Sequence, residues 1–238
     1  MQIHSLVFGE KGTSLVFLHG WQQNSRSFLP LVNFLYQNYR LYFLDLPGFG
    51  RSEIPPSSFT SFDYAMEVIN WIEKKKLKKI VLIGHSCGGK IASLVCIKKP
   101  QLVAKLVLID SAGISHPKKY YPLLKIIPKK ILKIVPEKFK VLISGKDYKE
   151  AGSLLPIFKT VVKENIRSLF SNLNVPTLII WGENDRETPL EDGKIMQKAI
   201  KKSTLTVVKD GHFPFWENPQ KISSLIENFI TNKNINES

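Results

Sequence analysis

The sequence predicts an α/β protein with a doubly wound, mostly parallel central sheet, helices on both faces and an inserted helical cap. Three observations support this prediction: apolar runs of strand length recur, helical patterns separate most of them, and one proline-rich segment interrupts the alternation. Strand–helix alternation with right-handed crossovers gives a parallel sheet covered on both sides. The 238 residues suffice for one such domain with an insertion.

The predicted strands are apolar throughout, as expected when both faces of a sheet are buried. They cover residues 14–18, 41–44, 80–83, 106–109, 177–181 and 205–208. Apolar residues at helical spacing predict helices over residues 62–75, 87–98, 190–200 and 219–230. Proline at the start of the last helix fits, since the first helical position needs no N–H donor.

Residues 115–170 break the alternation, and we interpret them as a basic helical cap, or lid, inserted into a core of residues 1–114 and 171–238. The segment contains five prolines, which keep its amphipathic pieces short. It has 13 Lys and Arg against 4 Asp and Glu, in a chain of net charge +14. A basic surface speeds encounters with anionic partners, but a solvated Lys-rich face is the simpler interpretation.

Composition argues against several other classes of protein. No apolar stretch approaches the roughly 18 residues of a membrane-spanning helix, and the N-terminus lacks the features of a signal peptide. The two cysteines, Cys87 and Cys96, do not suggest a disulfide framework, so we expect a cytoplasmic protein. The basic segment matches no nucleic-acid-binding module, so nucleic acid is not expected as a partner.

The segment IVLIGHSCGGKIA (80–92) carries the strongest chemical signal. Its residues 84–88, GHSCG, match G-x-S-x-G between a predicted strand and a predicted helix. A sharp turn of this kind lifts the Ser86 hydroxyl away from the sheet, and small neighbours leave room for it. Backbone N–H groups at the helix start point towards developing negative charge. Cys87 is a weaker candidate nucleophile, because the apex of the turn belongs to Ser86.

A serine hydroxyl needs a base at neutral pH, and the sequence offers one together with an acid. His212, in KDGHFPFWENP, follows the last predicted strand, and Asp185, in IIWGENDRETP, follows the strand before it. Both residues, like Ser86, come just after a strand's C-terminal end, where ligands bind in open α/β sheets. Asp110 also ends a predicted strand and stays open as an alternative acid. Glu183, two residues before Asp185, is a further candidate that we expect to point elsewhere.

Six motifs in order give the chain its resemblance to the α/β-hydrolase fold superfamily. They are FLHGW (17–21), LDLPGFGRS (44–52), GHSCGG (84–89), LIDSAG (108–113), WGENDRETP (181–189) and GHFPFWENP (211–219). The resemblance implies that Ser86 is the nucleophile, His212 the general acid and base, and Asp185 the residue that orients His212. It also implies an oxyanion hole formed by the backbone N–H groups of Trp21 and Cys87.

Substrate contacts are expected from side chains around this site. The candidates are Gln22, His85, Tyr120, Phe158 and Phe213. An apolar set in the predicted cap either lines an acyl pocket or attaches the cap to the core. This set is Tyr120, Tyr121, Leu123, Leu124, Phe139 and Phe158. The expected chemistry requires no cofactor, and the Cys and His spacings suggest no metal site.

The resulting hypothesis is a serine hydrolase that cleaves carboxylic esters of small or medium acyl substrates through an acyl-enzyme. Carbon–carbon bond hydrolysis, acyl transfer and a lyase step on the same fold stay open. A Lys-rich cap also suits esters carried by an acidic carrier protein, and relatives that cleave pimeloyl-carrier-protein methyl esters look similar in outline. A ligand receptor without enzymatic activity is the alternative from another class, because such receptors can retain the triad.

Overall fold

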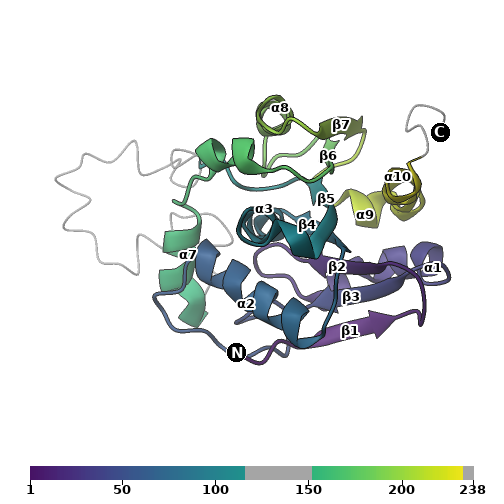
Figure 1. Ribbon diagram of the computed structural model, residues 1–238. Coiled ribbons are helices and arrows are strands. Elements are labelled where there is room, and N and C mark those ends of the chain that lie inside the picture. The colour runs from purple at the N-terminus through teal and green to yellow at the C-terminus, as the bar shows by residue number, and fades with distance from the viewer. Residues whose placement is uncertain (116–151, 233–238) are drawn as a thin grey trace.

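The computed structural model describes residues 1–115 and 152–232, which form a seven-stranded sheet with helices around it (Figure 1). The strands are β1 (Ser5–Phe8), β2 (Ser14–Leu18), β3 (Arg40–Leu44), β4 (Ile80–His85), β5 (Val103–Ile109), β6 (Thr177–Gly182) and β7 (Ser203–Val208). Their order across the sheet is β1-β3-β2-β4-β5-β6-β7, and every pair is parallel except β1 with β3. The predicted doubly wound, mostly parallel sheet is therefore confirmed.

Strand β1 is the strand that the apolar pattern does not predict. It runs antiparallel to β3 at the edge of the sheet, with Ser5 opposite Leu44 and Phe8 opposite Leu41. None of its four residues is fully buried, and Val7 is 44% exposed. An edge strand with one solvated side lacks the continuous apolar run that marks a central parallel strand, so the sequence signal is weak.

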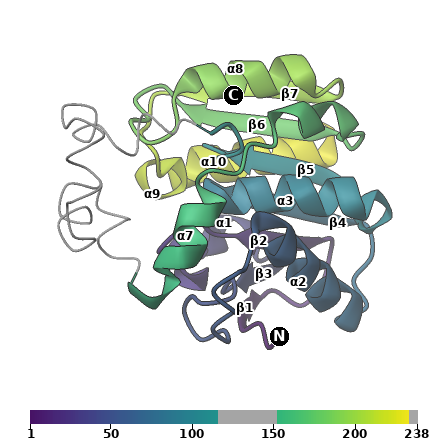
Figure 2. The ribbon, with the colours of Figure 1, turned by 90° about the vertical axis from the view of Figure 1, so that its left-hand side faces the viewer.

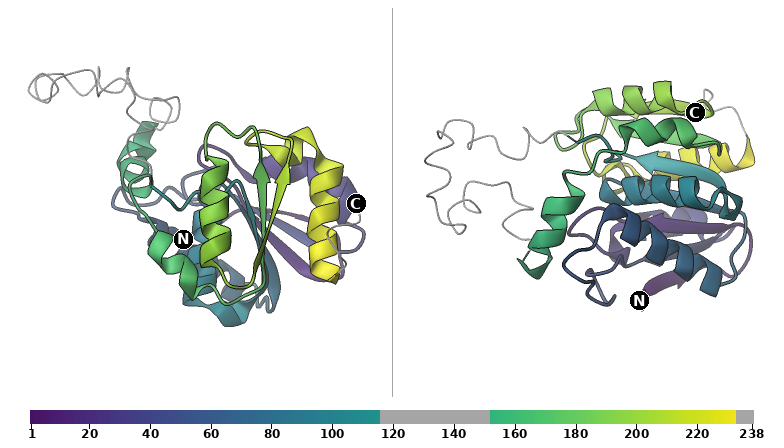
Figure 3. Two further views of the ribbon diagram at one scale, coloured as in Figure 1. Left: turned by 90° about the horizontal axis from the view of Figure 1, so that it is seen from above. Right: turned by 60° about the vertical axis from the view of Figure 1, so that its left-hand side comes forward.

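Helices cover both faces of the sheet, as predicted. One face carries α2 (Ser61–Lys74), α3 (Cys87–Lys98), α8 (Leu190–Ala199) and the 3-10 helix η4 (Arg167–Asn172). The other face carries the 3-10 helix η1 (Ser25–Leu31), α1 (Val32–Leu35), α9 (Pro214–Glu217) and α10 (Pro219–Thr231). A short 3-10 turn, η2 (Pro100–Leu102), leads into β5. Figure 3 shows α8 and α10 on opposite sides of the sheet.

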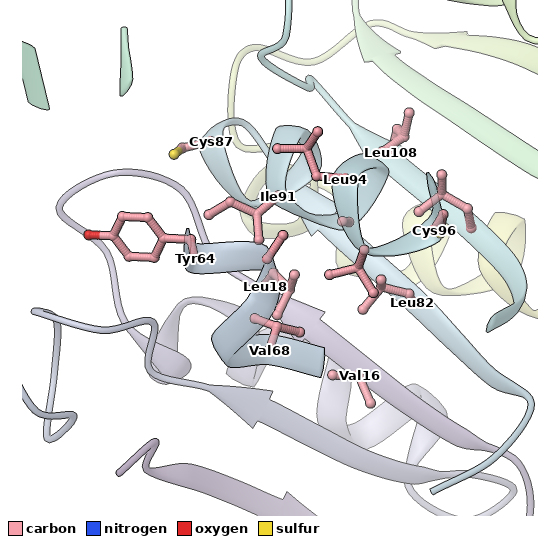
Figure 4. Packing of buried hydrophobic residues seen from close by; sticks show 14 of the residues in the cluster. Val16, Leu18, Tyr64, Val68, Leu82, Cys87, Ile91, Leu94, Cys96 and Leu108 are labelled. Carbon is pink, nitrogen blue, oxygen red and sulfur yellow. The ribbon is translucent and has the colours of Figure 1, made fainter. Parts of the chain in front are cut away.

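Alternate side chains of β2 enter two separate hydrophobic cores. Leu15 and Phe17 share a core with residues of η1, α1 and α10, whereas Val16 and Leu18 share one with residues of α2 and α3. Figure 4 shows part of this second core, including Val16, Leu18, Val68, Leu82, Ile91, Leu94 and Leu108. Because both faces are covered, the central strands are apolar throughout, which is why the sequence pattern locates them.

The winding of the chain reverses between β2 and β4. From β2 the chain crosses to β3 on one side, and it then passes through α2 to reach β4 on the other side of β2. From β4 the chain continues to β5, away from β2. The loops that follow the C-terminal ends of β2 and β4 therefore run in opposite directions. Ligands of open α/β sheets usually bind between two such loops.

Part of the predicted cap, residues 116–151, lies outside the described residues, as do five of its predicted apolar contacts. These five are Tyr120, Tyr121, Leu123, Leu124 and Phe139. The described remainder of the predicted cap contains the 3-10 turn η3 (Gly152–Leu154), α7 (Leu155–Val161) and most of η4. That residues 115–170 form a cap stays a prediction.

Helix α7 lies against α2 and α3 (Figure 2). The ammonium group of Lys90, in α3, donates to the main-chain oxygens of Val161 at 2.6 Å and Glu164 at 3.1 Å. The Glu164 carboxylate in turn accepts from the backbone N–H of Ser61, the first residue of α2, at 3.0 Å. Two core helices therefore hold the segment that enters the sheet at β6.

Both cysteines lie within α3. Cys87 and Cys96 are buried, and neither forms a disulfide. Across residues 1–115 and 152–232, no helix has the length and apolar character needed to cross a membrane.

Candidate active site

Ser86 stands at a sharp turn between β4 and α3. Its backbone has φ 51° and ψ −119°, a conformation that residues with side chains rarely adopt. Main-chain hydrogen bonds hold the turn: Ser86 N donates to Ile109 O at 3.1 Å, and Ser86 O accepts from Ala112 N at 2.9 Å. Ser86 stays partly exposed although the residues on both sides of it are buried.

Close packing explains the glycines of this turn. A Cβ atom on Gly84 would lie 2.5 Å from Gly88 O, and a Cβ atom on Gly88 would lie 2.1 Å from Leu18 O. Side-chain carbons do not approach oxygens so closely, so α3 reaches β4 and β2 only because these positions lack a side chain. The glycines therefore set the approach of helix and strands that exposes Ser86.

His212 and Asp185 form a close pair on the loops that follow β7 and β6. His212 Nδ1 lies 2.7 Å from Asp185 Oδ2. Asp185 Oδ1 accepts from the backbone N–H groups of Glu187 at 2.6 Å and Thr188 at 3.0 Å, and its Oδ2 accepts from the Thr188 hydroxyl at 2.6 Å. The Asp185 side chain is fully buried, whereas that of His212 is 11% exposed. Asp185 thus holds the imidazole by Nδ1 and leaves Nε2 facing away from the carboxylate.

The Asp185 carboxylate is ionised although it is buried. Burial by itself raises the pKa of Asp185, but the contact with His212 and the donors of Thr188 outweigh burial and lower this pKa to about 2. At neutral pH the carboxylate is therefore a strong acceptor for the proton on Nδ1 of His212.

His85 brings the turn at Ser86 and the loop of His212 together. His85 Nε2 lies 2.8 Å from the main-chain oxygen of His212, and the two imidazole centroids are 4.7 Å apart. Within the described residues, the His212 ring hydrogen-bonds to Asp185 and not to the Ser86 hydroxyl. The hydrogen bond between a catalytic serine and its histidine is often long in the absence of substrate and shortens in the substrate complex.

The loop after β2, residues 19–23, packs against the turn at Ser86. A Cβ atom on Gly20 would lie 3.1 Å from Ser86 Cβ, so the two segments touch. His19 is fully buried, and its Nδ1 donates to Gly20 O at 2.7 Å while its Nε2 accepts from Leu46 N at 3.0 Å. Burial lowers the pKa of His19 to about 4, so this ring is neutral at pH 7.

The residues expected to form an oxyanion hole lie on the two sides of the switch between β2 and β4. Trp21 is on the loop after β2, and Cys87 is at the start of the helix after β4. Cys87 is the first residue of α3, where the helix dipole favours negative charge. The Trp21 ring packs against Phe49 and Phe158, with centroid distances of 5.0 and 5.1 Å. These contacts fix the Trp21 side chain on the side of the loop that faces α7.

Comparison with known proteins identifies the family of this chain. The sequence profile of the alpha/beta hydrolase fold matches residues 13–144. The chain belongs to the α/β-hydrolase fold family. The uncharacterized hydrolase YugF of Bacillus subtilis is 31% identical to it over an alignment of 246 positions, and the alignment covers 91% of this chain and 89% of the relative. The predicted resemblance is therefore confirmed.

Two further relatives have more specific names. The 2-hydroxy-6-oxononadienedioate/2-hydroxy-6-oxononatrienedioate hydrolase 1 of Pseudomonas putida is 28% identical, and the match covers 97% of this chain and 92% of the relative. The pimeloyl-[acyl-carrier protein] methyl ester esterase of Wigglesworthia glossinidia brevipalpis is 26% identical, with 94% and 96% covered. Among solved structures, a bacterial membrane phospholipase A covers 99% of this chain, with 84% of its own length matched, a TM-score of 0.80 and 22% identity, which shows the shared fold.

Two aromatic residues that we expect to contact substrate lie near the site of this α/β-hydrolase-fold protein. Phe213 is 40% exposed, and its ring centroid lies 5.1 Å from that of His212. Phe158, in α7, is 2% exposed and packs on Trp21. Phe213 is therefore accessible from solvent, whereas Phe158 is covered. Tyr120 lies outside the described residues.

The two polar candidates for substrate contact differ in accessibility. Gln22 is half-buried and has a left-handed backbone, with φ 58°. His85 is completely buried, and both of its ring nitrogens contact protein groups, Gln23 Nε2 and the main-chain oxygen of His212. His85 thus presents no ring nitrogen to a substrate in this structure.

Asp110, the alternative acid, contacts the loop of Asp185 rather than His212. Its Oδ1 accepts from the backbone N–H of Gly182 at 2.8 Å, and its main-chain oxygen lies 3.1 Å from the Thr188 hydroxyl. Burial raises the pKa of Asp110 well above its usual value, which is opposite to the direction for Asp185. The exposed Glu183 lies on the same loop.

Thr188 is a residue of the site that the sequence analysis misses. Its N–H and its hydroxyl both donate to Asp185, three residues earlier. An aspartate that accepts from the backbone ahead of it is a recognised turn pattern, so D-R-E-T (185–188) contains a usable signal. Within the described residues, no group of three or more His, Cys, Asp or Glu side chains is arranged to hold a metal ion.

Proposed function

We propose that this protein is a serine hydrolase that cleaves carboxylic esters of small or medium acyl groups through an acyl-enzyme. The observation that carries the proposal is the 2.7 Å contact between His212 Nδ1 and the buried Asp185 carboxylate, beside a serine at a strained strand–helix turn. An imidazole held by a carboxylate, on a loop that His85 connects to the turn of a partly exposed serine, supplies the groups that nucleophilic catalysis by serine requires.

In the first half of the proposed reaction, Ser86 Oγ attacks the carbonyl carbon of the ester and His212 Nε2 accepts the hydroxyl proton. Asp185 stays ionised and stabilises the resulting imidazolium through Nδ1–H. The tetrahedral intermediate then collapses, the carbon–oxygen bond to the alcohol breaks, and His212 returns the proton to the leaving alcohol.

In the second half, water attacks the acyl-enzyme. His212 Nε2 accepts a proton from the water and then gives it to Ser86 Oγ as the carboxylic acid leaves. We assign stabilisation of the oxyanion in both halves to the backbone N–H groups of Trp21 and Cys87. Loss of one such donor typically costs about 3 kcal/mol of transition-state stabilisation.

The apolar surroundings favour an acyl group over a highly polar substrate. Phe213 lies next to His212, and Trp21 and Phe158 form an aromatic cluster near the loop after β2. Ligand sites are generally lined by aromatic and apolar side chains with few polar groups. We assign the choice of acyl length to the proposed cap, residues 115–170, because its described helix α7 carries Phe158.

Labelling with a fluorophosphonate, followed by turnover of p-nitrophenyl esters of increasing chain length, tests the proposal. We expect the label on Ser86 and no turnover in Ser86→Ala. Ser171→Ala, the same exchange at an exposed serine of η4, is the matched control, and we expect it to retain the label on Ser86 and the turnover of esters. Label on another residue, or turnover that survives Ser86→Ala, contradicts the proposal. A folded wild-type protein without label or turnover favours a ligand receptor.

Carbon–carbon bond hydrolysis is the second candidate, and the Pseudomonas putida relative favours it. That relative is named for a 2-hydroxy-6-oxo dioate, a compound without an ester bond, so its hydrolysis must break a carbon–carbon bond. The two candidates share the same serine and histidine but differ in product. Mass spectrometry of products from an ester and from a 2-hydroxy-6-oxo dioate separates them.

An acidic acyl carrier protein is the partner that the Wigglesworthia relative suggests, because that protein is named for an acyl-carrier-protein ester. Residues 115–170, with 13 basic against 4 acidic side chains, supply the complementary charge. Salt should then weaken activity on carrier-bound esters far more than activity on free esters. An equal salt effect on both substrates removes this candidate.

A further inference from the structure

His85 precedes Ser86 in the chain, yet its side chain connects two other loops. It is completely buried at the end of β4. Its Nε2 lies 2.8 Å from the main-chain oxygen of His212, and its Nδ1 lies 3.3 Å from Gln23 Nε2. One ring therefore contacts the loop after β2 and the loop after β7, which three intervening strands separate in the sheet.

Hydrogen-bond chemistry sets the proton position on this ring. A main-chain oxygen only accepts, so His85 Nε2 must carry the proton that it donates to His212. In the neutral ring Nδ1 is then an acceptor, and it receives an N–H of the Gln23 amide. The other end of that amide, Gln23 Oε1, accepts from Gly20 N at 3.4 Å. The three hydrogen bonds therefore form one chain with a single consistent direction.

The surroundings keep His85 neutral and in place. Burial, reinforced by the neighbouring His212, lowers the pKa of His85 well below its usual value, so the ring does not become cationic near neutral pH. Its ring packs between His212, Phe213 and Phe215, with centroid distances of 4.7, 5.2 and 4.9 Å. A ring enclosed in this way cannot turn to face a substrate.

The contact at Gly20 shows how closely the chain of hydrogen bonds is packed. A Cβ atom on Gly20 would lie 2.6 Å from Gln23 Nε2 and 3.1 Å from His85 Nδ1. The loop after β2 therefore approaches His85 only because residue 20 has no side chain. A small displacement of His85 would shift both Gln23 and the backbone at Gly20, directly before Trp21.

We propose that His85 is a positioning residue that fixes the backbone of His212 relative to the loop of Gly20 and Trp21. This inference rests on the proposed function, in which His212 moves the proton while the Trp21 N–H stabilises the oxyanion. Both groups act on the same transition state, so their relative placement matters for rate more than for substrate binding. Misplacement of catalytic groups by about 1 Å typically costs about 100-fold in rate.

Four variants test the role of His85 with p-nitrophenyl butyrate as the probe. His85→Phe keeps an aromatic ring but removes the donor to His212, and we expect kcat to fall about 10- to 100-fold with little change in KM. His85→Gln restores an N–H near the position of Nε2 and recovers part of kcat. Gln23→Leu lowers kcat, and it lowers kcat much less when His85→Phe is already present.

Proton NMR gives a readout that does not depend on turnover. The proton on His212 Nδ1, shared with the Asp185 carboxylate, should give a far-downfield resonance in wild-type protein. We expect this resonance to shift or broaden in His85→Phe and to return in His85→Gln. His4→Phe, the same exchange at a partly exposed histidine near the N-terminus, is the matched control and leaves both kcat and the resonance unchanged.

The outcomes separate this inference from the proposed function. Unchanged kcat and an unchanged resonance in folded His85→Phe overturn the positioning role, as does full additivity of the two substitutions. If His85→Phe does not fold, kcat and the His212 resonance of Gln23→Leu and of His85→Gln are compared with those of the wild-type protein instead. If the wild-type protein turns over no ester, the proposed function fails, and the resonance still decides whether His85 positions His212.

Discussion

Asp185 and Asp110 follow the neighbouring parallel strands β6 and β5, yet Asp185 is the carboxylate that contacts His212, at 2.7 Å. Both belong to one network, because the Thr188 hydroxyl donates to Asp185 Oδ2 at 2.6 Å and lies 3.1 Å from Asp110 O. Their pKa values move in opposite directions, down for Asp185 and up for Asp110. The two residues therefore have different roles, and substitution separates them.

Asp185→Asn should lower kcat for p-nitrophenyl esters by about 10⁴-fold, because an amide no longer holds the proton on Nδ1 of His212 and the wrong tautomer results. Asp110→Asn is the matched comparison, and we expect it to lower kcat less than about 10-fold, since Asp110 does not contact His212. Steady-state kinetics at pH 7–8 measures both. A larger loss in Asp110→Asn than in Asp185→Asn would reverse the assignment of the acid.

Asp110→Asn should also change how stability depends on pH. The raised pKa of Asp110 in the folded protein means that, above about pH 4, the folded state keeps a proton that the unfolded state releases. The contribution of Asp110 to wild-type stability is complete below the pKa that this residue has in the unfolded chain. It decreases as pH rises towards the pKa of Asp110 in the folded protein. Asn does not titrate, so the stability of Asp110→Asn relative to wild type should increase with pH.

Urea unfolding of both proteins at several pH values between 4 and 8 measures this difference. A difference that stays constant across the range would mean that Asp110 is ionised in the folded protein.

Gly88→Ala should prevent the turn at Ser86 from forming correctly, because the new Cβ would lie 2.1 Å from Leu18 O. The backbone of α3 must move away from β2, and we expect a loss of about 3 kcal/mol or more in the free energy of unfolding. Gly152→Ala is the control: its φ of 51° gives some strain, but a Cβ there meets no atom within 4 Å. Denaturant unfolding that shows equal losses for both variants would contradict the packing argument.

Lys90→Met should loosen α7 without unfolding the core. The substitution leaves the main-chain oxygens of Val161 and Glu164 without the donor that they have in wild type, and a buried acceptor without a donor costs about 1–3 kcal/mol. Hydrogen exchange of residues 155–166 should therefore become at least about 10-fold faster. Lys99→Met removes only an exposed pair with Glu73 and should not change exchange there. Equal exchange in all three proteins would show that Lys90 does not hold α7.

Long-range neighbours decided what the sequence left open about single residues. Lys90 gives no sign in the sequence that it is buried, because its two acceptors lie 71 and 74 residues further along the chain. His85 looks like part of a pocket wall next to Ser86, but the approach of the loops after β2 and β7 encloses it. The apolar pattern does not reveal the edge strand β1, because none of its four residues is fully buried.

The sequence by itself determined the positions of the six strands that are parallel to a neighbour, the glycine-rich turn at Ser86 and the family, because these depend on local patterns. Buried parallel strands must be apolar, and a tight helix–strand contact must have glycine at fixed spacing. The family motifs already implied Asp185 as the acid, whereas tertiary structure alone decided which residues hold the loops. Asp110 and Asp185 both follow a core strand, and the three-dimensional course of the loops after β5, β6 and β7 brings Asp185, rather than Asp110, within 2.7 Å of the imidazole.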